Sequence, residues 1–268
     1  MPTEQTQSAR VTVERAEERE EREDHARTGG AAKRMAVQRA AALQRRTGVR
    51  RFLYENSLGL VAFALFALSF AGQIVAGTAH YNEERADHGE PPVSMGEYLR
   101  TGAFLEATAE NWESEFLQMG LFVVLTAFLY QRGSSESKKI EEPEAVDQPP
   151  REAKDDPEAP WPVRRGGLPL ALYKHSLSIT LFVLFAISFT MHAVGGAAEY
   201  NEEQAQHGGA PVSVAGYLAT SRFWFESLQN WQSEFLAVGV LVLLSIWLRE
   251  QGSPQSKPVG AAAHETGR

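Results

Sequence analysis

The stretch that decides the fold is LGLVAFALFALSFAGQIVAGTA, residues 58–79, in which Gln73 is the one strongly polar side chain. An α-helix needs about 20 consecutive apolar residues to cross the hydrocarbon core of a bilayer, and this segment meets that length. A second run, LSITLFVLFAISFTMHAVGGAA, follows at residues 177–198 and contains His192. Both runs predict transmembrane helices.

The two apolar runs belong to a longer internal repeat. Tyr54 aligns with Tyr173, and the alignment continues without a gap at a constant offset of 119 positions to Lys138 and Lys257. Roughly 40 of about 85 aligned pairs are identical, which predicts tandem copies of one structural unit. The longest identical blocks are Tyr-Asn-Glu-Glu at 81–84 and 200–203, and Ser-Glu-Phe-Leu at 114–117 and 233–236.

Each copy holds a second, shorter apolar segment that begins at Phe116 or Phe235. These segments reach spanning length when the preceding Asn-Trp-x-Ser-Glu turn joins the helix, which places the second spans at 113–131 and 232–249. Buried core helices are the alternative for runs this short. The expected fold is an all-α membrane protein with four transmembrane helices, built as two tandem parallel-repeat helical hairpins.

The placement of basic residues predicts the orientation of the spans. Lysines and arginines gather before the first span, between the second and third spans, and after the fourth, whereas the two loops within the hairpins hold only Arg85, Arg100 and Arg222. By the positive-inside rule, both termini and the central linker are cytoplasmic and the short loops are external. The two copies then point the same way, related by a pseudo-two-fold axis along the membrane normal.

Five parts follow along the chain. They are a charged, then basic, cytoplasmic tail at 1–51, membrane repeat 1 at 52–138, a disordered acidic and proline-rich cytoplasmic linker at 139–165, membrane repeat 2 at 166–257, and a cytoplasmic tail at 258–268. The chain has no cysteine, which excludes disulfides and thiolate metal sites. A net charge of -8 argues against nucleic-acid binding. The apolar spans make the lipid bilayer the expected partner. Self-association is left open, and a protein partner is not identified.

Two acidic residues, Glu115 and Glu234, lie at the edges of the second spans. Ionisable groups inside a membrane are costly and are functional candidates for that reason, so these carboxylates are candidates for a proton or cation path. Gln73 stands where the other copy has His192, which counts against a relay shared by both copies. The alternative is hydrogen bonding across helices. The candidate partners are Asn111, Asn230, Tyr81 and Tyr200.

A weaker pattern lies just beyond the first span of each copy, where Glu84 and His88 are repeated as Glu203 and His207. Residues four apart share one face of a helix, and carboxylate and imidazole groups are suitable ligands for a transition metal. The structural alternative is a polar helix end whose histidine lies beside a helix-ending glycine. No cofactor is therefore expected, with a divalent metal at these four residues as the alternative.

The sequence holds no phosphate-binding loop, nucleophile elbow or zinc-hydrolase motif, so enzymatic activity is not expected. The leading interpretation is a non-enzymatic membrane, envelope or interaction protein. A small transporter or channel for protons or cations, using Glu115 and Glu234, is the first alternative. A metal-binding membrane protein is the second.

The repeated Tyr-Asn-Glu-Glu, His-Gly and Asn-Trp-x-Ser-Glu-Phe-Leu motifs resemble those of an uncharacterised bacterial family of duplicated integral membrane proteins, known as a domain of unknown function. The resemblance covers about residues 50–257. It implies a location in the bacterial cytoplasmic (inner) membrane as a multi-pass protein, and it implies no activity, substrate or cofactor.

Overall fold

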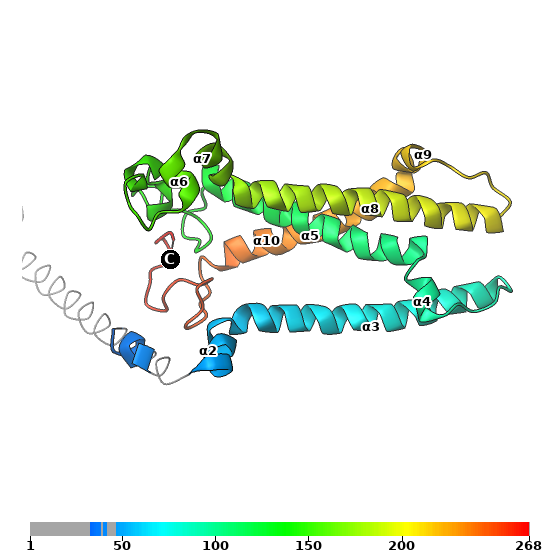
Figure 1. Cartoon of the computed structure of the whole chain (residues 1–268), viewed down its shortest axis with the longest axis horizontal. Coiled ribbons are helices and arrows are strands. Elements are labelled where there is room, and N and C mark those ends of the chain that lie inside the picture. The colour runs from blue at the N-terminus through cyan, green and yellow to red at the C-terminus, as the bar shows by residue number, and fades with distance from the viewer. Residues whose placement is uncertain (1–32, 39, 42–46, 268) are drawn as a thin grey trace, which may run out of the picture. The chain divides into compact units, whose positions relative to one another are not determined.

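The computed structural model describes residues 33–38, 40, 41 and 47–267, and these residues form helices and no strands (Figure 1). The all-helical prediction is confirmed. The mixed-charge part of the predicted tail, residues 1–30, lies outside the described residues. The helices are α2 Gly48–Glu55, α3 Ser57–Asp87, α4 Met95–Tyr98, α5 Gly102–Phe128, η1 Ala145–Asp147, η2 Pro150–Ala153, α6 Trp161–Arg165, α7 Gly167–Tyr173, α8 Ser176–Gln206, α9 Val214–Leu218 and α10 Ser221–Leu244.

The chain divides into two compact units, residues 1–72 and residues 73–268, and the boundary falls inside α3. In the first unit, α2 precedes the apolar first part of α3. An ion pair between Arg51 Nε and Glu55 Oε1, 2.7 Å apart on adjacent turns, closes α2. The second unit contains the polar end of α3 and all later helices, and it holds the clusters described below.

Among the described residues, α3 and α8 are the two helices long and apolar enough to cross a membrane. They contain the two predicted first spans and continue for about two turns beyond them. The predicted second spans lie on α5 and α10, which are 27 and 24 residues long. Both of these helices begin earlier than the predicted spans, and the added parts carry Glu106 and Glu110 on α5 and Glu226 on α10.

In the second unit, α5 and α8 lie side by side over much of their length, and α10 packs against α5 (Figure 1). Two glycines make the α5–α8 contact close. A Cβ atom on Gly195 would lie 2.6 Å from the main-chain nitrogen of Glu106, and one on Gly102 would lie 2.7 Å from that of Glu199. Small residues let helix backbones approach in this way.

The turn after α3 has the same structure as the turn after α8. Gly89 and Gly208 adopt φ angles of 73° and 71°, so the predicted glycine ends of both helices are confirmed. In the first turn, the Asn82 side chain accepts from Val93 N at 2.7 Å and donates to Val93 O at 3.0 Å. Asn201 makes the same two bonds with Val212. The repeated asparagine therefore has a structural role.

Ser94 caps α4, and Glu97 completes a capping box with it. Hydrogen bonds from the backbone and side chain of Ser94 lower the pKa of Glu97. Ser213 caps α9 by accepting from the main-chain nitrogen of Gly216, so this turn needs no box.

Residues 258–267 fold back on the chain. Lys257 is almost fully buried, and its ammonium group donates to the main-chain oxygens of Ala262, Ala263 and Glu265. The main-chain nitrogen of Gly267 donates to Ser134 O at 3.0 Å. The last of these bonds joins the C-terminal segment to the Gly-Ser turn that follows α5.

Candidate metal centre

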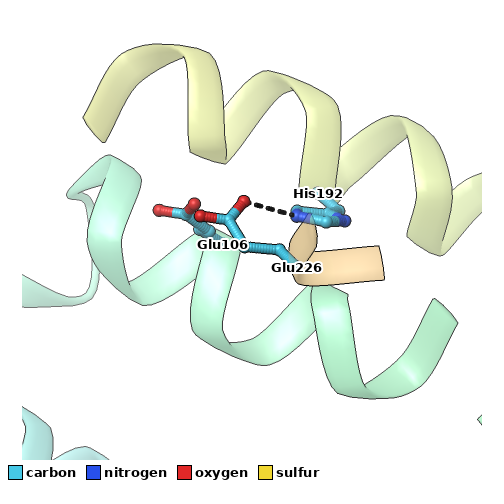
Figure 2. Close-up of side chains that lie close together, drawn as sticks. All are labelled: Glu106, His192 and Glu226. Atoms are coloured by element: carbon cyan, nitrogen blue, oxygen red, sulfur yellow. Dashed lines mark ion pairs between the residues drawn. The ribbon is translucent and has the colours of Figure 1, made fainter. Parts of the chain in front are cut away.

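Three helices of the second unit bring two carboxylates and one imidazole together. Glu106 comes from α5, His192 from α8 and Glu226 from α10, and one ligand atom of each lies within 4.8 Å of the others. Figure 2 shows the carboxyl groups of Glu106 and Glu226 side by side, with His192 next to Glu226. We call these three residues the Glu–His–Glu cluster.

His192 is held in one orientation by a second carboxylate. Its Nδ1 lies 2.7 Å from Glu113 Oε2, and both side chains are 0 % exposed. The other oxygen of Glu113 accepts a hydrogen bond from Trp231 Nε1 at 3.0 Å. Because an ionised carboxylate can only accept, Nδ1 carries the proton that donates to it. In the neutral imidazole, Nε2 then presents a lone pair towards Glu226.

Nε2 of His192 is buried and makes no hydrogen bond within the described residues. Its nearest charged neighbour is Glu226 Oε2, at 3.5 Å. The Phe223 ring, whose centroid lies 4.8 Å from that of the imidazole, covers His192. A buried polar atom without a partner is unfavourable, so this nitrogen is available for a ligand that accepts a lone pair.

A single tyrosine contacts both carboxylates of the cluster. The Tyr217 hydroxyl donates to Glu226 Oε2 at 2.6 Å and lies 3.1 Å from Glu106 Oε1. Its one proton can serve only one carboxylate, so the pair needs a further proton or a cation. Gly196 lets the ring reach this place, because a Cβ atom there would lie 2.5 Å from the Tyr217 hydroxyl oxygen.

Further charged and polar groups lie next to the cluster. Arg222 Nε donates to Glu226 Oε1 at 2.8 Å, and another nitrogen of the same guanidinium donates to Glu203. The side-chain amide of Asn230 donates to Glu110. Carboxylates thus outnumber the permanent positive charges around His192.

The two predicted path residues lie elsewhere. Glu115 on α5 is exposed and Glu234 on α10 is half-buried, and neither belongs to the Glu–His–Glu cluster. Asn111 donates to its own helix, at the main-chain oxygen of Ala107. Asn230, in contrast, lies at the rim of the cluster through its bond to Glu110.

The two predicted tyrosines have different surroundings. Tyr81 donates to Glu202 Oε1 at 2.8 Å, a hydrogen bond between α3 and α8. Burial, together with Glu202, raises the pKa of Tyr81 to about 12. The ring of Tyr200 packs against that of Tyr217, with centroids 5.8 Å apart.

The four predicted metal-ligand candidates, Glu84, His88, Glu203 and His207, line one pocket of about 210 Å³. The two imidazole rings have centroids 6.2 Å apart. This pocket, which we call the outer pocket, is separate in its residues from the Glu–His–Glu cluster. Its lining residues are Tyr81, Glu84, Arg85, His88, Glu199, Glu202, Glu203, Gln206 and His207.

Reasoning from the sequence missed Glu106, Glu113 and Glu226, and it noted His192 only as the counterpart of Gln73. These residues lie at positions where the two aligned copies differ. The counterparts of Glu106, Glu113 and Glu226 are Phe225, Gln232 and Ala107. A search for ionisable residues present in one copy alone would have found the cluster. The identical blocks instead indicate the repeated helices and turns.

The fold and the cluster define an all-helical protein with two apolar helices of membrane-spanning length and a buried carboxylate–imidazole group. Over residues 13–268 the chain matches a family described as a domain of unknown function, DUF6766. The chain belongs to this family, which confirms the resemblance at the level of an uncharacterised family. A search of the curated proteins finds no match, and neither does a search of the solved structures.

Proposed function

We propose that the protein is a non-enzymatic, multi-pass membrane protein that binds one divalent transition-metal ion at Glu106, His192 and Glu226. The observation that carries the proposal is the convergence of three ligand atoms within 4.8 Å at a buried imidazole nitrogen without a hydrogen-bond partner. The role of the ion is structural or in storage or transfer, since no catalytic motif accompanies it.

The donor set suits a metal of intermediate softness. Imidazole nitrogen favours zinc, iron, nickel and copper, whereas carboxylate oxygen also favours manganese, so one nitrogen with two oxygens fits Zn²⁺, Fe²⁺ or Mn²⁺. Glu113 supports this assignment, because metal-bound histidines generally donate their other ring N–H to a carboxylate or carbonyl group. Tyr217 holds the two carboxylates in the same way, and three protein ligands leave further coordination positions open.

Charge supports a cation at this place. Glu106, Glu113 and Glu226 bring three carboxyl groups, against which Arg222 is the permanent cation in direct contact. Leaving unpaired charge in a buried place is costly. A divalent ion would take the place of the further proton that the Glu106 and Glu226 carboxylates need, and it would neutralise part of the remaining charge.

For the membrane topology, we propose four spans in a bacterial cytoplasmic membrane, with α3, α5, α8 and α10 as two tandem hairpins. At about 1.5 Å per residue, α5 and α10 are roughly 40 and 36 Å long, enough to cross a bilayer. Two of the glutamates that make α5 polar, Glu106 and Glu113, are buried by helix packing. The basic residues favour cytoplasmic termini and an external metal cluster.

Metal binding by the full-length protein tests the function. Protein purified in mild detergent, stripped with a chelator and dialysed against Zn²⁺ or Mn²⁺ should bind an ion that Glu106→Gln/Glu226→Gln does not bind, as measured by elemental analysis. The matched control is Glu115→Gln/Glu234→Gln, which removes two glutamates from the same two helices and should keep the ion. Equal metal content in all three proteins would rule out the cluster as the site.

A further inference from the structure

The outer pocket shows three features that the buried cluster does not explain. It is lined by four glutamates and two histidines, with Arg85 as its one basic side chain. Its histidines, His88 and His207, occupy matching positions of the two aligned copies and have been brought together from the ends of α3 and α8. One of its carboxylate oxygens, Glu199 Oε2, is buried and has no hydrogen-bond partner within the described residues.

The two histidines are fixed in the same tautomer. Nδ1 of His88 lies 2.8 Å from the main-chain oxygen of Glu84, and Nδ1 of His207 lies 2.8 Å from that of Glu203. A carbonyl oxygen can only accept, so Nδ1 is the protonated nitrogen in both rings. Each neutral imidazole therefore keeps its lone pair on Nε2. This is the arrangement that backbone carbonyl groups impose on histidines that bind metals.

The distance between the two rings fits one shared ion. A metal–nitrogen bond to imidazole is about 2.1 Å long, so an ion bound by two imidazoles holds their centroids roughly 5 to 6.5 Å apart, depending on the angle at the metal. The observed separation is 6.2 Å. The rings stand at 77° to each other in an edge-to-face contact.

The carboxylates of the pocket differ in how many hydrogen-bond and ion-pair partners they have. Glu202 accepts from Tyr81 and lies 3.5 Å from Arg85, and Glu203 accepts from Arg222. Glu84 has only the imidazole of His80, 3.4 Å away, as a partner in an ion pair. With neutral histidines, four carboxylates face one lining guanidinium, so the pocket has a surplus of negative charge that a cation would reduce.

We propose that the outer pocket is a second divalent-cation site, in which Nε2 of His88 and Nε2 of His207 bind one transition-metal ion and the carboxylates of the lining offset its charge. Two imidazole ligands favour Zn²⁺, Cu²⁺ or Ni²⁺ over Mg²⁺ or Ca²⁺. None of these ligands belongs to the Glu–His–Glu cluster, so this site can be tested independently of the proposed function. Arg222 contacts Glu203 at this pocket and Glu226 at the cluster, which places the two sites in one charged network.

The number of nitrogen ligands separates the two sites experimentally. Full-length protein in detergent is loaded with Cu²⁺ and studied by electron paramagnetic resonance, where nitrogen hyperfine structure counts bound imidazoles. The outer pocket should give a species with two nitrogens, whereas the cluster offers only His192. Zn²⁺ content measured by elemental analysis of the same proteins gives the stoichiometry.

His88→Gln/His207→Gln should lose the two-nitrogen species and bind one Zn²⁺ per chain fewer, while His192→Gln keeps that species. Each single variant should weaken binding by more than about tenfold, since one ligand is lost. Both histidines are exposed, so folding should be unaffected, and unchanged thermal unfolding of the variants checks this. The matched control is His175→Gln, an exposed histidine before the first turn of α8 and outside the pocket.

The outer site is overturned if the two-nitrogen species is absent from the wild type, or if it survives in His88→Gln/His207→Gln. Equal loss in His175→Gln would show binding to exposed histidines in general and would also overturn it. A Zn²⁺ content that His192→Gln leaves unchanged would instead count against the buried cluster, and the result for the outer pocket would still hold.

Discussion

A His192→Gln variant is expected to bind a divalent ion at the proposed buried cluster with an affinity at least about 100-fold lower than that of the wild type. Removing a group that merely orients a metal ligand typically costs 10- to 100-fold in affinity, so removing the ligand itself costs no less. The substitution also takes away the imidazole that pairs with the fully buried Glu113 at 2.7 Å. Glutamine is the residue that stands at the matching position, Gln73.

Two measurements check this expectation. Equilibrium dialysis with Zn²⁺ gives the affinity directly. Thermal unfolding gives it indirectly, because an ion at 100 times its dissociation constant stabilises the folded state by about 2.7 kcal/mol. The melting temperature of the wild type should rise with Zn²⁺, and that of His192→Gln should rise less, by the share that the cluster contributes. Equal binding and equal shifts in both proteins would contradict the assignment of His192 as a ligand.

The reverse substitution, Gln73→His, is the matched control. It places an imidazole at position 73, which corresponds to His192 in the other aligned copy. The positions that match Glu106, Glu113 and Glu226 hold Phe225, Gln232 and Ala107, so this histidine has no corresponding carboxylates. Gln73→His should therefore add no bound ion, which would show that the carboxylates and not the histidine alone create the site.

Gly195→Ala is expected to destabilise the protein by roughly 1–3 kcal/mol, although alanine favours helices more than glycine does. The added Cβ atom would lie 2.6 Å from the main-chain nitrogen of Glu106 and 3.0 Å from the main-chain carbon of Leu105. Backbone atoms cannot rotate away as a side chain does, so α5 and α8 must move apart. Since the contact falls at Glu106, metal affinity should decrease together with stability.

Gly239→Ala is the matched control for this prediction. Gly239 lies within α10 and a Cβ atom there would meet nothing within 4 Å, so the substitution should be neutral or stabilise by about 0.5–1 kcal/mol. Thermal unfolding in the same detergent compares the two variants with the wild type. If Gly195→Ala unfolds at the same temperature as Gly239→Ala, the close contact between α5 and α8 does not limit stability.

Much of the architecture could be predicted from the sequence because the signals are local. Runs such as residues 58–79 are apolar on all sides of a helix, and they lie within α3 and α8. Gly89 and Ser94 mark a helix end and a helix start by chemistry that acts within a few residues. The identical blocks of the two copies include such local features, and the bonds of Asn82 and Asn201 show why both copies keep them.

The carboxylates beside His192 could not be predicted in this way. Glu106 and Glu226 are 120 positions apart in the chain, and nothing in either neighbourhood indicates that the other lies close. Their meeting depends on how closely α5 and α8 approach at Gly195, on the ring of Tyr217 over Gly196, and on the packing of α10 against α5.

The apolar runs thus determined, by themselves, which segments become long helices and where these end, because hydrophobic length and helix capping are properties of consecutive residues. Only the tertiary structure decided which polar side chains share a site. Helix packing selected Glu106, Glu113, His192 and Glu226 from positions that differ between the two copies, and it placed His88 beside His207 from positions that are identical. Contacts between distant segments carry this information, since burial and charge act through space.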